Sequence, residues 1–428
     1  MQTFTKARAF YLIILFSISC FAWSACDKDD DDSSNPNPVP PPVTIAAPVN
    51  LLVHTPRTIG FTVAWDKVEG ASSYNLYIAT DAGFTQLANG YSPKSVTANT
   101  EQLDGLSRNT LYYVKVEGVK NGVRGLSATQ SQKTSAEDVF IVGFENGALR
   151  EPRVWVSENN PVWLQPSNSN PYGVFVSGND TYVAGTAWTS NGIALYWKNG
   201  QAILLSNNPN GSSASDIFVS GNDVYVSGEE RGINREACYW KNGQKISLGN
   251  GTASSIVVSG TDVYVTGSVP NGRAIVATLW KNGVPADLTD GQNTSFAAKV
   301  FLAGKDVYVC GSEVVNNKRI PKYWKNGISH TLESNGLDAS CSDIFVSNND
   351  VYISGWEITT PEGGGFYWKN GQMIRLPGST KADAIHVVGE NVYIAGSSGQ
   401  DVKYWKNGTA VTLAKTNREA FVADIFVR

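Results

Sequence analysis

A five-residue motif, Tyr-Trp-Lys-Asn-Gly, constrains the fold of this chain more than any other feature. Copies begin at Tyr196, Tyr239, Tyr323, Tyr367 and Tyr404, and a near copy, Leu-Trp-Lys-Asn-Gly, begins at Leu279. The motif marks a unit of roughly forty residues, a length typical of repeat architectures. Asn-Gly favours a two-residue hairpin turn because both of its residues must adopt positive φ. Each copy therefore predicts a tight turn between two β-strands.

The clearest repeat contains four short β-patterns in a fixed order. The expected strands, named a to d, are Asp216–Ser220, Val224–Ser227, Cys238–Lys241 and Lys245–Leu248. A Gly-Asn-Asp turn joins a to b, and the Asn-Gly of the motif joins c to d. The repeat therefore predicts one small antiparallel sheet, and a large ring in each repeat is suited to filling the wedge between adjacent twisted sheets.

The number of strands predicts how the array ends. The Trp of strand c occurs seven times, at Trp155, Trp197, Trp240, Trp280, Trp324, Trp368 and Trp405. The first unit, which begins at Asp138, lacks strand a, whereas the chain ends on an unmatched copy at Ala423–Arg428. Pairing this last strand with the first unit removes the exposed sheet edges of a linear array. We predict a seven-bladed β-propeller over residues 136–428, closed by the C-terminal strand; an open β-solenoid is the alternative.

The repeats also resemble a known class. Their Trp-x-Asn-Gly pattern is similar to the short repeats of bacterial extracellular propeller proteins, and the resemblance covers the same residues, 136–428. The blades lack the Gly-His and Trp-Asp signatures of WD40 repeats and the Gly-Gly doublets of kelch repeats.

Residues 47–135 predict a separate β-sandwich, so the whole chain is expected to be all-β. Alternating segments such as IGFTVAW and YNLYIA are separated by turn residues. The segment resembles a fibronectin type III domain through Trp65, Tyr74 and the spacing of Leu106, Thr110 and Tyr112. The resemblance implies an Ig-like sandwich in which the Tyr112 hydroxyl bonds nearby backbone, and it implies no chemistry. We expect a spacer rather than an adhesive module.

The N-terminus indicates a cellular address. Lys6 and Arg8 precede an apolar stretch that resembles a signal peptide over residues 1–25. Small residues before Cys26 and the acidic run after it, Asp27–Asp32, resemble a bacterial lipoprotein signal with a surface-export tag. The resemblance implies a lipid on Cys26, an outer-membrane anchor facing the cell exterior, and a Pro-rich tether over residues 26–46. Cys20 offers a rival site, and secretion with a free Cys26 thiol is the other alternative.

Composition and cysteine use exclude several kinds of function. The chain has 34 Lys+Arg against 38 Asp+Glu and no basic cluster after the N-terminus, so we expect no nucleic-acid partner. Cys238, Cys310 and Cys341 show no metal-ligand spacing. We therefore predict buried free thiols, no metal site and no cofactor, although a bridge between Cys310 and Cys341 is an alternative.

Catalytic motifs are not found in the sequence. No H-E-x-x-H, G-x-S-x-G, phosphate-binding loop or EF-hand loop occurs. His54, His330 and His386 are scattered, and we interpret each as structural. Asp216, Asp343 and Asp424, at the start of strand a in their repeats, are interpreted as strand-edge residues; lining a central channel and binding a cation is the alternative.

Loop lengths indicate where recognition could occur. The a–b and c–d connections are short in nearly every repeat, whereas the b–c and d–a connections vary, and these two sets lie on opposite faces of a four-stranded meander. We predict candidate ligand-binding residues in the variable loops: Trp188, Arg231, Arg235, Lys318, Arg319 and Trp356. The alternative for each Trp is that it covers a blade edge.

These features favour a monomeric, non-catalytic lipoprotein that binds glycans or another extracellular macromolecule, since Trp rings suit sugar faces. A protein-interaction scaffold in an outer-membrane complex is the second hypothesis. The third is a polysaccharide hydrolase or lyase whose paired carboxylates come from different blades.

Overall fold

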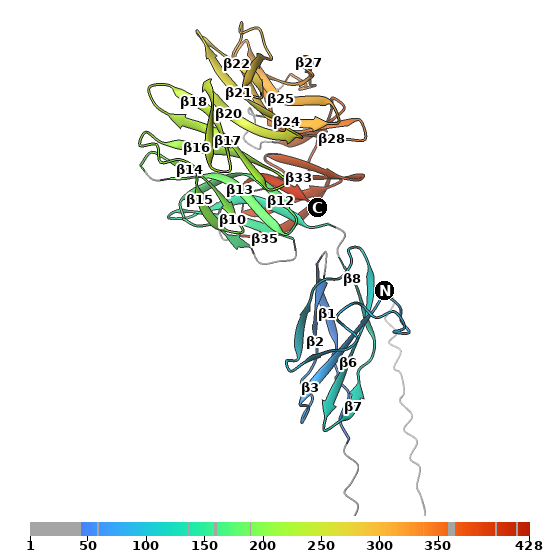
Figure 1. Ribbon diagram of the computed structural model, residues 1–428. Coiled ribbons are helices and arrows are strands. Elements are labelled where there is room, and N and C mark those ends of the chain that lie inside the picture. Colours follow the sequence, from blue (N-terminus) through green and yellow to red (C-terminus); the bar gives the residue numbers. More distant parts are fainter. Residues whose placement is uncertain are drawn as a thin grey trace, which may run out of the picture. The chain divides into compact units, whose positions relative to one another are not determined.

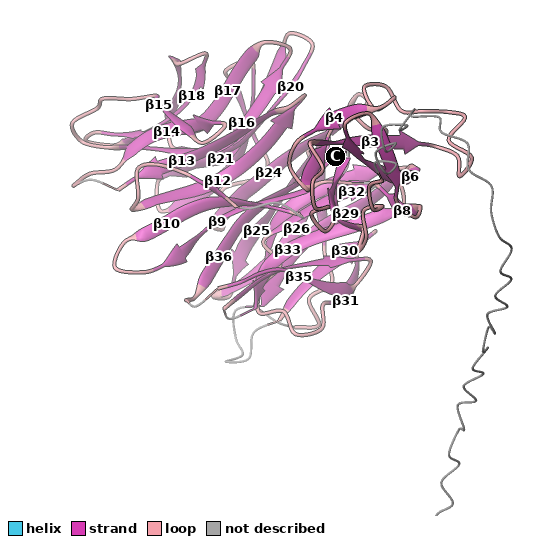
Figure 2. Ribbon diagram, turned by 90° about the horizontal axis from the view of Figure 1, so that it is seen from below, coloured by secondary structure: helices cyan, strands magenta, loops and turns pink. Residues whose placement is uncertain are grey.

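A computed structural model describes residues 44–57, 60–134, 137–157, 161–188, 190–336, 338–357, 364–398, 400–416 and 418–428. These residues form strands and connecting loops (Figure 2). Among them we find no helix with the length and hydropathy needed to cross a membrane. The predicted signal peptide, Cys26 and the acidic run lie outside the described ranges.

The first eight strands form two sheets around a single core. Their order is β1-β2-β5 in one sheet and β4-β3-β6-β7 in the other, where β8 also pairs with β6. The bounds are β1 Leu52–Arg57, β2 Gly60–Ala64, β3 Ser73–Ala79, β4 Lys94–Val96, β5 Thr100–Leu103, β6 Leu111–Lys120, β7 Val123–Leu126 and β8 Gln130–Lys133. Trp65 packs edge-on against Tyr74 in this core, at 5.2 Å between ring centroids. The Ser107 N–H donates to the Tyr112 hydroxyl at 2.9 Å, which confirms the predicted backbone bond of this tyrosine.

The remaining strands form seven four-stranded antiparallel sheets within the described residues, here called blades 1 to 7 (Figure 1). Blade 1 has the order β11-β10-β9-β36, with bounds β9 Val139–Asn146, β10 Arg150–Val156, β11 Val162–Trp163 and β36 Ala420–Val427. The other blades use consecutive strands. For blades 2 to 4 the bounds are β12 Ser169–Ser177, β13 Asp180–Ala187, β14 Ile193–Lys198, β15 Gln201–Leu204, β16 Ser212–Ser220, β17 Asp223–Arg231, β18 Arg235–Lys241, β19 Gln244–Asn250, β20 Thr252–Ser259, β21 Asp262–Asn271, β22 Ala274–Lys281 and β23 Val284–Asp287.

Blades 5 to 7 continue the pattern to the end of the chain. Their bounds are β24 Ser295–Ala303, β25 Asp306–Val315, β26 Lys318–Lys325, β27 Ile328–Thr331, β28 Ala339–Ser347, β29 Asp350–Glu357, β30 Gly365–Lys369, β31 Gln372–Arg375, β32 Ala384–Val388, β33 Asn391–Ser398, β34 Asp401–Lys406 and β35 Thr409–Lys415. The repeated blades form a β-propeller.

The repeated motif is explained by contacts within each blade. In blade 3, Trp240 is buried, and Asn242 and Gly243 adopt φ of 51° and 81°, as a type I′ turn requires. The Lys241 ammonium lies 2.9 Å from the Asp223 carboxylate and 5.2 Å from the centroid of the Tyr225 ring. Asn242 accepts the Val224 N–H and donates to Asp223 at 2.8 Å. The motif therefore joins hairpin a–b to hairpin c–d through an ion pair and hydrogen bonds.

The glycine within strand b of each blade has a separate packing role. At Gly228 an added Cβ would collide with the carbonyl of Ser213 and with the Trp240 ring. The close approach of β16 and β17 therefore requires glycine at this position.

In blades 7 and 1, residues outside the motif make the equivalent ionic contacts. Blade 7 has Asn391 where most other blades have Asp, and Glu137 supplies the carboxylate, 3.3 Å from Lys406. In blade 1 the last residue, Arg428, contacts Asp138 at 3.4 Å and lies over the Phe140 ring. Both contacts, Glu137 with Lys406 and Arg428 with Asp138, join residues from the two ends of the repeat array.

The C-terminal strand pairs with the first strand of the array, as predicted. In β36, Ile425 lies opposite Ile141 and Phe426 opposite Phe140, and Ile425 and Val427 are buried. The backbones of Asp138 and Arg428 exchange hydrogen bonds of 3.0 and 3.2 Å. Blade 1 is thus built from both ends of the array, and β36 covers the edge that β9 would otherwise expose.

Candidate recognition face and central channel

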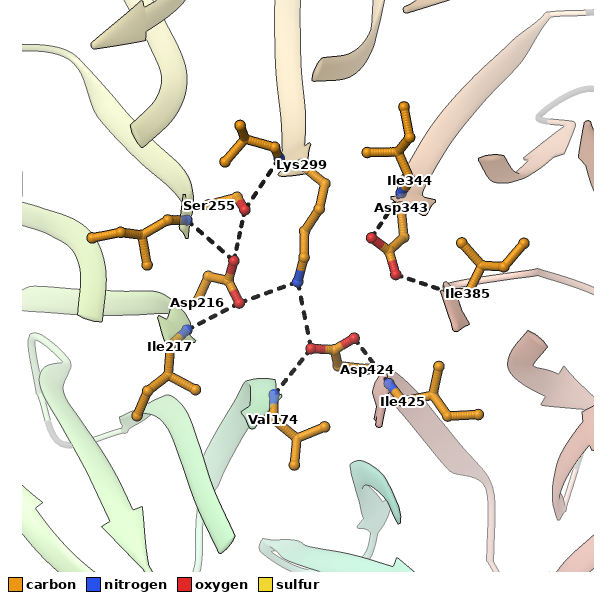
Figure 3. Close-up of polar contacts among 12 residues, drawn as sticks. Val174, Asp216, Ile217, Ser255, Lys299, Asp343, Ile344, Ile385, Asp424 and Ile425 are labelled. Atoms are coloured by element: carbon orange, nitrogen blue, oxygen red, sulfur yellow. Dashed lines mark hydrogen bonds and ion pairs between the residues drawn. The ribbon is translucent and has the colours of Figure 1, made fainter. Parts of the chain in front are cut away.

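The inner strands of the blades surround a cavity of about 180 Å³. A bulge shifts the register of inner strands such as β16, where the shift falls between Ala214 and Asp216. Such a bulge re-aims the side chain that follows it. Figure 3 shows the result, with Asp216, Lys299, Asp343 and Asp424 converging from four blades.

Seven backbone N–H groups at one level of the inner strands each donate a hydrogen bond to a side-chain oxygen, with N–O distances of 2.7 to 3.3 Å. Three aspartates and one serine supply these oxygens. The donors and acceptors are Ile217 and Ile256 to Asp216, Val300 to Ser255, Ile344 and Ile385 to Asp343, and Ile425 and Val174 to Asp424. Because each acceptor bonds an amide of the next blade, this polar ring joins neighbouring sheets.

Lys299 supplies the positive charge of the polar ring. Its ammonium lies 3.1 Å from Asp216 and 3.5 Å from Asp424. Burial opposes this charge, but the surrounding carboxylates outweigh burial and hold the pKa of Lys299 well above its ordinary value. Burial raises the pKa of Asp343 to about 7, with Lys299 opposing and Asp424 adding to the shift.

An aromatic collar follows the polar ring along the same strands. Its rings are Phe175, Phe218, Phe301, Phe345, His386 and Phe426, and Val257 fills the place in blade 4. Successive centroids lie 4.6 to 5.3 Å apart from Phe218 through Phe175, Phe426, His386 and Phe345 to Phe301. Burial and the charge of Lys299 lower the pKa of His386 to about 4, so the imidazole is neutral at physiological pH.

The channel acids therefore have partners within the chain. The three acids line the channel, as the alternative prediction placed them, rather than serving only as strand-edge residues. Asp216 and Asp424 contact the Lys299 ammonium, and Asp343 accepts the Ile344 and Ile385 N–H groups. Within the described residues, no group of three His, Cys, Asp or Glu side chains has a geometry that could hold a metal ion. Cys238, Cys310 and Cys341 are free and buried, as predicted.

The predicted ligand-binding residues are spread over four blades. Trp188 lies in blade 2, Arg231 and Arg235 in blade 3, Lys318 and Arg319 in blade 5, and Trp356 in blade 6. The prediction that all of them lie on loops was wrong, because only Trp188 follows the end of its strand. Strands b and c stay paired for several residues beyond the expected strand ends. In blade 3, for example, Arg231 of β17 still lies opposite Arg235 of β18.

Several of these residues are already engaged within the propeller. Arg231 and Arg235 both contact the buried carboxylate of Glu229, at 3.6 and 2.9 Å. Trp356 lies beneath Lys381, whose ammonium is 4.4 Å from the ring centroid. Lys318 donates to a loop carbonyl, and the Arg319 N–H donates to an aspartate of the same loop. The structure does not bring the six residues together into one site.

Around Trp188, however, the variable face carries a cluster that sequence reasoning did not find. We call Phe144, Arg150, Tyr172, Trp188 and Phe421 the aromatic patch. The Phe144 and Phe421 rings stack at 4.9 Å, and the Arg150 guanidinium lies 5.2 Å from the Phe144 ring and 6.0 Å from the Trp188 ring. Tyr172 and Phe421 are each 36% exposed. The patch thus combines two accessible rings with a guanidinium held between two others.

Asn170 connects the two halves of the aromatic patch. It accepts a hydrogen bond from Arg150 at 2.9 Å and donates one to the Tyr172 hydroxyl at 3.1 Å. Tyr172 is the bulge residue of β12, between Pro171 and Gly173, and it has no partner residue in the register with β13. The patch is therefore fixed by contacts between blades 1 and 2 before any ligand arrives.

An acid at one equivalent position of four blades on the same face is paired with a cation. Glu145 contacts Arg153 at 2.8 Å, and the equivalent acids of three other blades have a Lys or Arg partner. Those pairs are Glu230 with Lys245, Glu313 with Lys322, and Glu357 with Arg375. These carboxylates anchor the ends of their hairpins.

No protein-family model matches the chain, and no curated protein sequence matches it. Solved structures with a similar fold include a chain of a nidogen/laminin complex, with 9% identity over 68% of this chain and 98% of that chain and a TM-score of 0.40. TolB from Acinetobacter baumannii has 11% identity over 57% of this chain and 74% of that chain, with a TM-score of 0.35. A GH43 endo-arabinanase from Bacillus licheniformis has 13% identity over 47% of this chain and 95% of that chain, with a TM-score of 0.27. Such similarities concern the arrangement of strands, so function must be inferred from this chain's own residues.

Proposed function

We propose that this protein is a non-catalytic lipoprotein that binds a glycan on the variable face of its propeller. The aromatic patch is the observation that carries the proposal. Apolar ring faces stack on the C–H surfaces of sugars, and a few fixed polar groups then orient the hydroxyls. Tyr172 and Phe421 present such rings, and Arg150 and Asn170 supply polar groups whose positions are set by their own contacts.

The architecture is suited to presenting this face at a distance from the membrane. We propose that the sandwich is a fibronectin type III-like spacer and that the propeller is of the bacterial Trp-x-Asn-Gly kind. A lipid on Cys26 and the Pro-rich tether of residues 26–46 would then carry both on the outer surface of the cell.

The anchoring can be tested by metabolic labelling with radioactive palmitate. Cys26→Ser should abolish labelling and release the protein from membranes, whereas Cys20→Ser should leave both unchanged. Replacing Asp29–Asp32 with asparagines should preserve labelling but reduce protease access on whole cells. Labelling that survives Cys26→Ser would refute this lipid site, and unchanged protease access would refute the export tag.

Glycan binding is tested by array screening of the full chain purified in detergent. We expect Tyr172→Ala and Phe421→Ala each to weaken binding about tenfold, because loss of a stacking ring costs on the order of 1 kcal/mol or more. Trp163→Ala is the matched control, since this ring is 51% exposed but lies on the outer strand of blade 1.

Two outcomes would contradict the proposal. Equal loss of binding in the Trp163 control would show that the aromatic patch is not the binding site. No binding to any glycan, together with an envelope protein that co-purifies with the full chain, would favour the scaffold hypothesis instead.

A further inference from the structure

Within the part of the chain that the structure describes, the Arg150 side chain has no carboxylate partner, unlike those of the nearby Arg153 and Arg418. Among the described residues its side chain contacts the Phe144 ring, the Trp188 ring and Asn170. In contrast, Arg153 contacts Glu145 and Glu151, at 2.8 and 3.0 Å. Four further arginines of the same face also have a glutamate partner: Arg231, Arg235, Arg375 and Arg418.

The position of Arg150 makes this unpaired charge usable by a ligand. Its side chain is partly buried, and two aromatic rings and one amide oxygen hold it in place. A guanidinium has five N–H donors, and Asn170 uses one of them. A fixed guanidinium loses little further conformational freedom when it binds an anion.

The hydrogen-bonding groups of the aromatic patch are mainly donors. Asn170 Oδ1 is occupied by Arg150, and the Tyr172 oxygen accepts from Asn170. Among the described residues, no acceptor takes the Tyr172 O–H, which can donate to a ligand. Glu419, an exposed acid on the adjoining loop, makes no ion pair with Arg150. A ligand group with acceptor oxygens and negative charge therefore complements this site better than a neutral hydroxyl.

We infer that the glycan bound at the aromatic patch is acidic, with a carboxylate or sulfate group that pairs with Arg150 while a sugar ring lies against Tyr172 and Phe421. This inference rests on the proposed function and adds the chemical class of the ligand. Carboxylate and sulfate oxygens both match the planar fork of a guanidinium, so the test must separate the two sources.

The test compares matched pairs of oligosaccharides on the full chain. An oligogalacturonate is paired with its neutral methyl ester, and a sulfated oligosaccharide with its desulfated form. We expect the acidic member of at least one pair to bind more tightly, and which pair responds identifies the anionic group. Arg150→Gln should weaken acidic binding about tenfold or more, as expected for loss of a charge-assisted hydrogen bond. Binding of the neutral member should fall by a smaller factor, because it loses a neutral hydrogen bond rather than a charge-assisted one.

Further variants distinguish a fixed fork from a general positive charge. Arg150→Lys should recover only part of the affinity, because the ammonium keeps the charge but not the paired donors. Glu419→Gln should strengthen acidic binding and leave neutral binding unchanged. Arg235→Gln is the control on another blade, and thermal melts of all variants establish that they fold.

The outcomes separate this inference from the proposed function. Equal binding of acidic and neutral members, unaffected by Arg150→Gln, would overturn the acidic ligand while glycan binding stands. No binding of any oligosaccharide would overturn both. An effect of Arg235→Gln equal to that of Arg150→Gln would assign the binding to overall surface charge and overturn the role of Arg150.

Discussion

Removal of Asp424–Arg428 is expected to unfold the propeller at much lower temperature than the full chain. The deletion removes the buried Ile425 and Val427 and leaves the inner edge of β9 unpaired where β36 had covered it. It also removes the Asp424 carboxylate that accepts the Val174 N–H. Loss of several buried side chains costs roughly 5 kcal/mol or more, which is comparable with the whole stability of many domains.

A thermal melt followed by circular dichroism measures this effect. Ile425→Ala should reproduce part of the loss, whereas Phe421→Ala, on the more exposed end of the same strand, should change the melting temperature little. A truncated chain whose melt overlays that of the full chain would refute closure by the C-terminal strand.

Lys299→Met is expected to destabilise the propeller by about 3–5 kcal/mol at pH 8, the usual cost of removing one partner of a buried ion pair. The three channel aspartates would then lack the ammonium that lies 3.1 and 3.5 Å from two of them. Lys305→Met, at an exposed turn of the same blade, is the control and should have little effect.

The loss of stability caused by Lys299→Met should depend on pH in a defined direction. Burial raises the pKa of Asp343 from 3.8 to about 7, so its contribution to stability is complete below pH 4 and is lost as pH rises through 7. Burial also raises the pKa of Asp424, and Lys299 opposes both shifts. Without Lys299 both values should rise further, so Lys299→Met should be less destabilising at pH 5 than at pH 8. Urea midpoints that fall equally at both pH values would contradict this account.

The architecture could be predicted because its determinants are local and repeated. Asn242-Gly243 specifies a turn through its own backbone geometry, and Trp240 specifies a buried position through its size. The unmatched last strand indicated closure because one missing strand and one surplus strand implied each other. None of these inferences needed knowledge of distant contacts.

The sites depend on contacts that no local pattern reveals. Phe144 and Phe421 are 277 positions apart in the chain. They meet only because β36 pairs with β9 in a register that places them opposite each other. Lys299 occupies a place where three other blades have Asp, but its role depends on which blades face each other across the channel. Trp188 was found because a large ring in a loop is visible in the sequence. The role proposed for Arg150 depends instead on residues that only the fold brings close to it.

The polar ring also restricts how the array can have grown. Its blades look interchangeable at the turns, yet they do not all contribute the same residue to the polar ring, and an acceptor in one blade serves a donor in the next. Loss of the third repeat would remove Asp216, leave the Ile256 N–H without its acceptor and take one of the two contacts from Lys299. Duplication or deletion of a single repeat would therefore have required compensating changes in its neighbours, so the hairpins could diversify one at a time while the number of repeats stayed fixed.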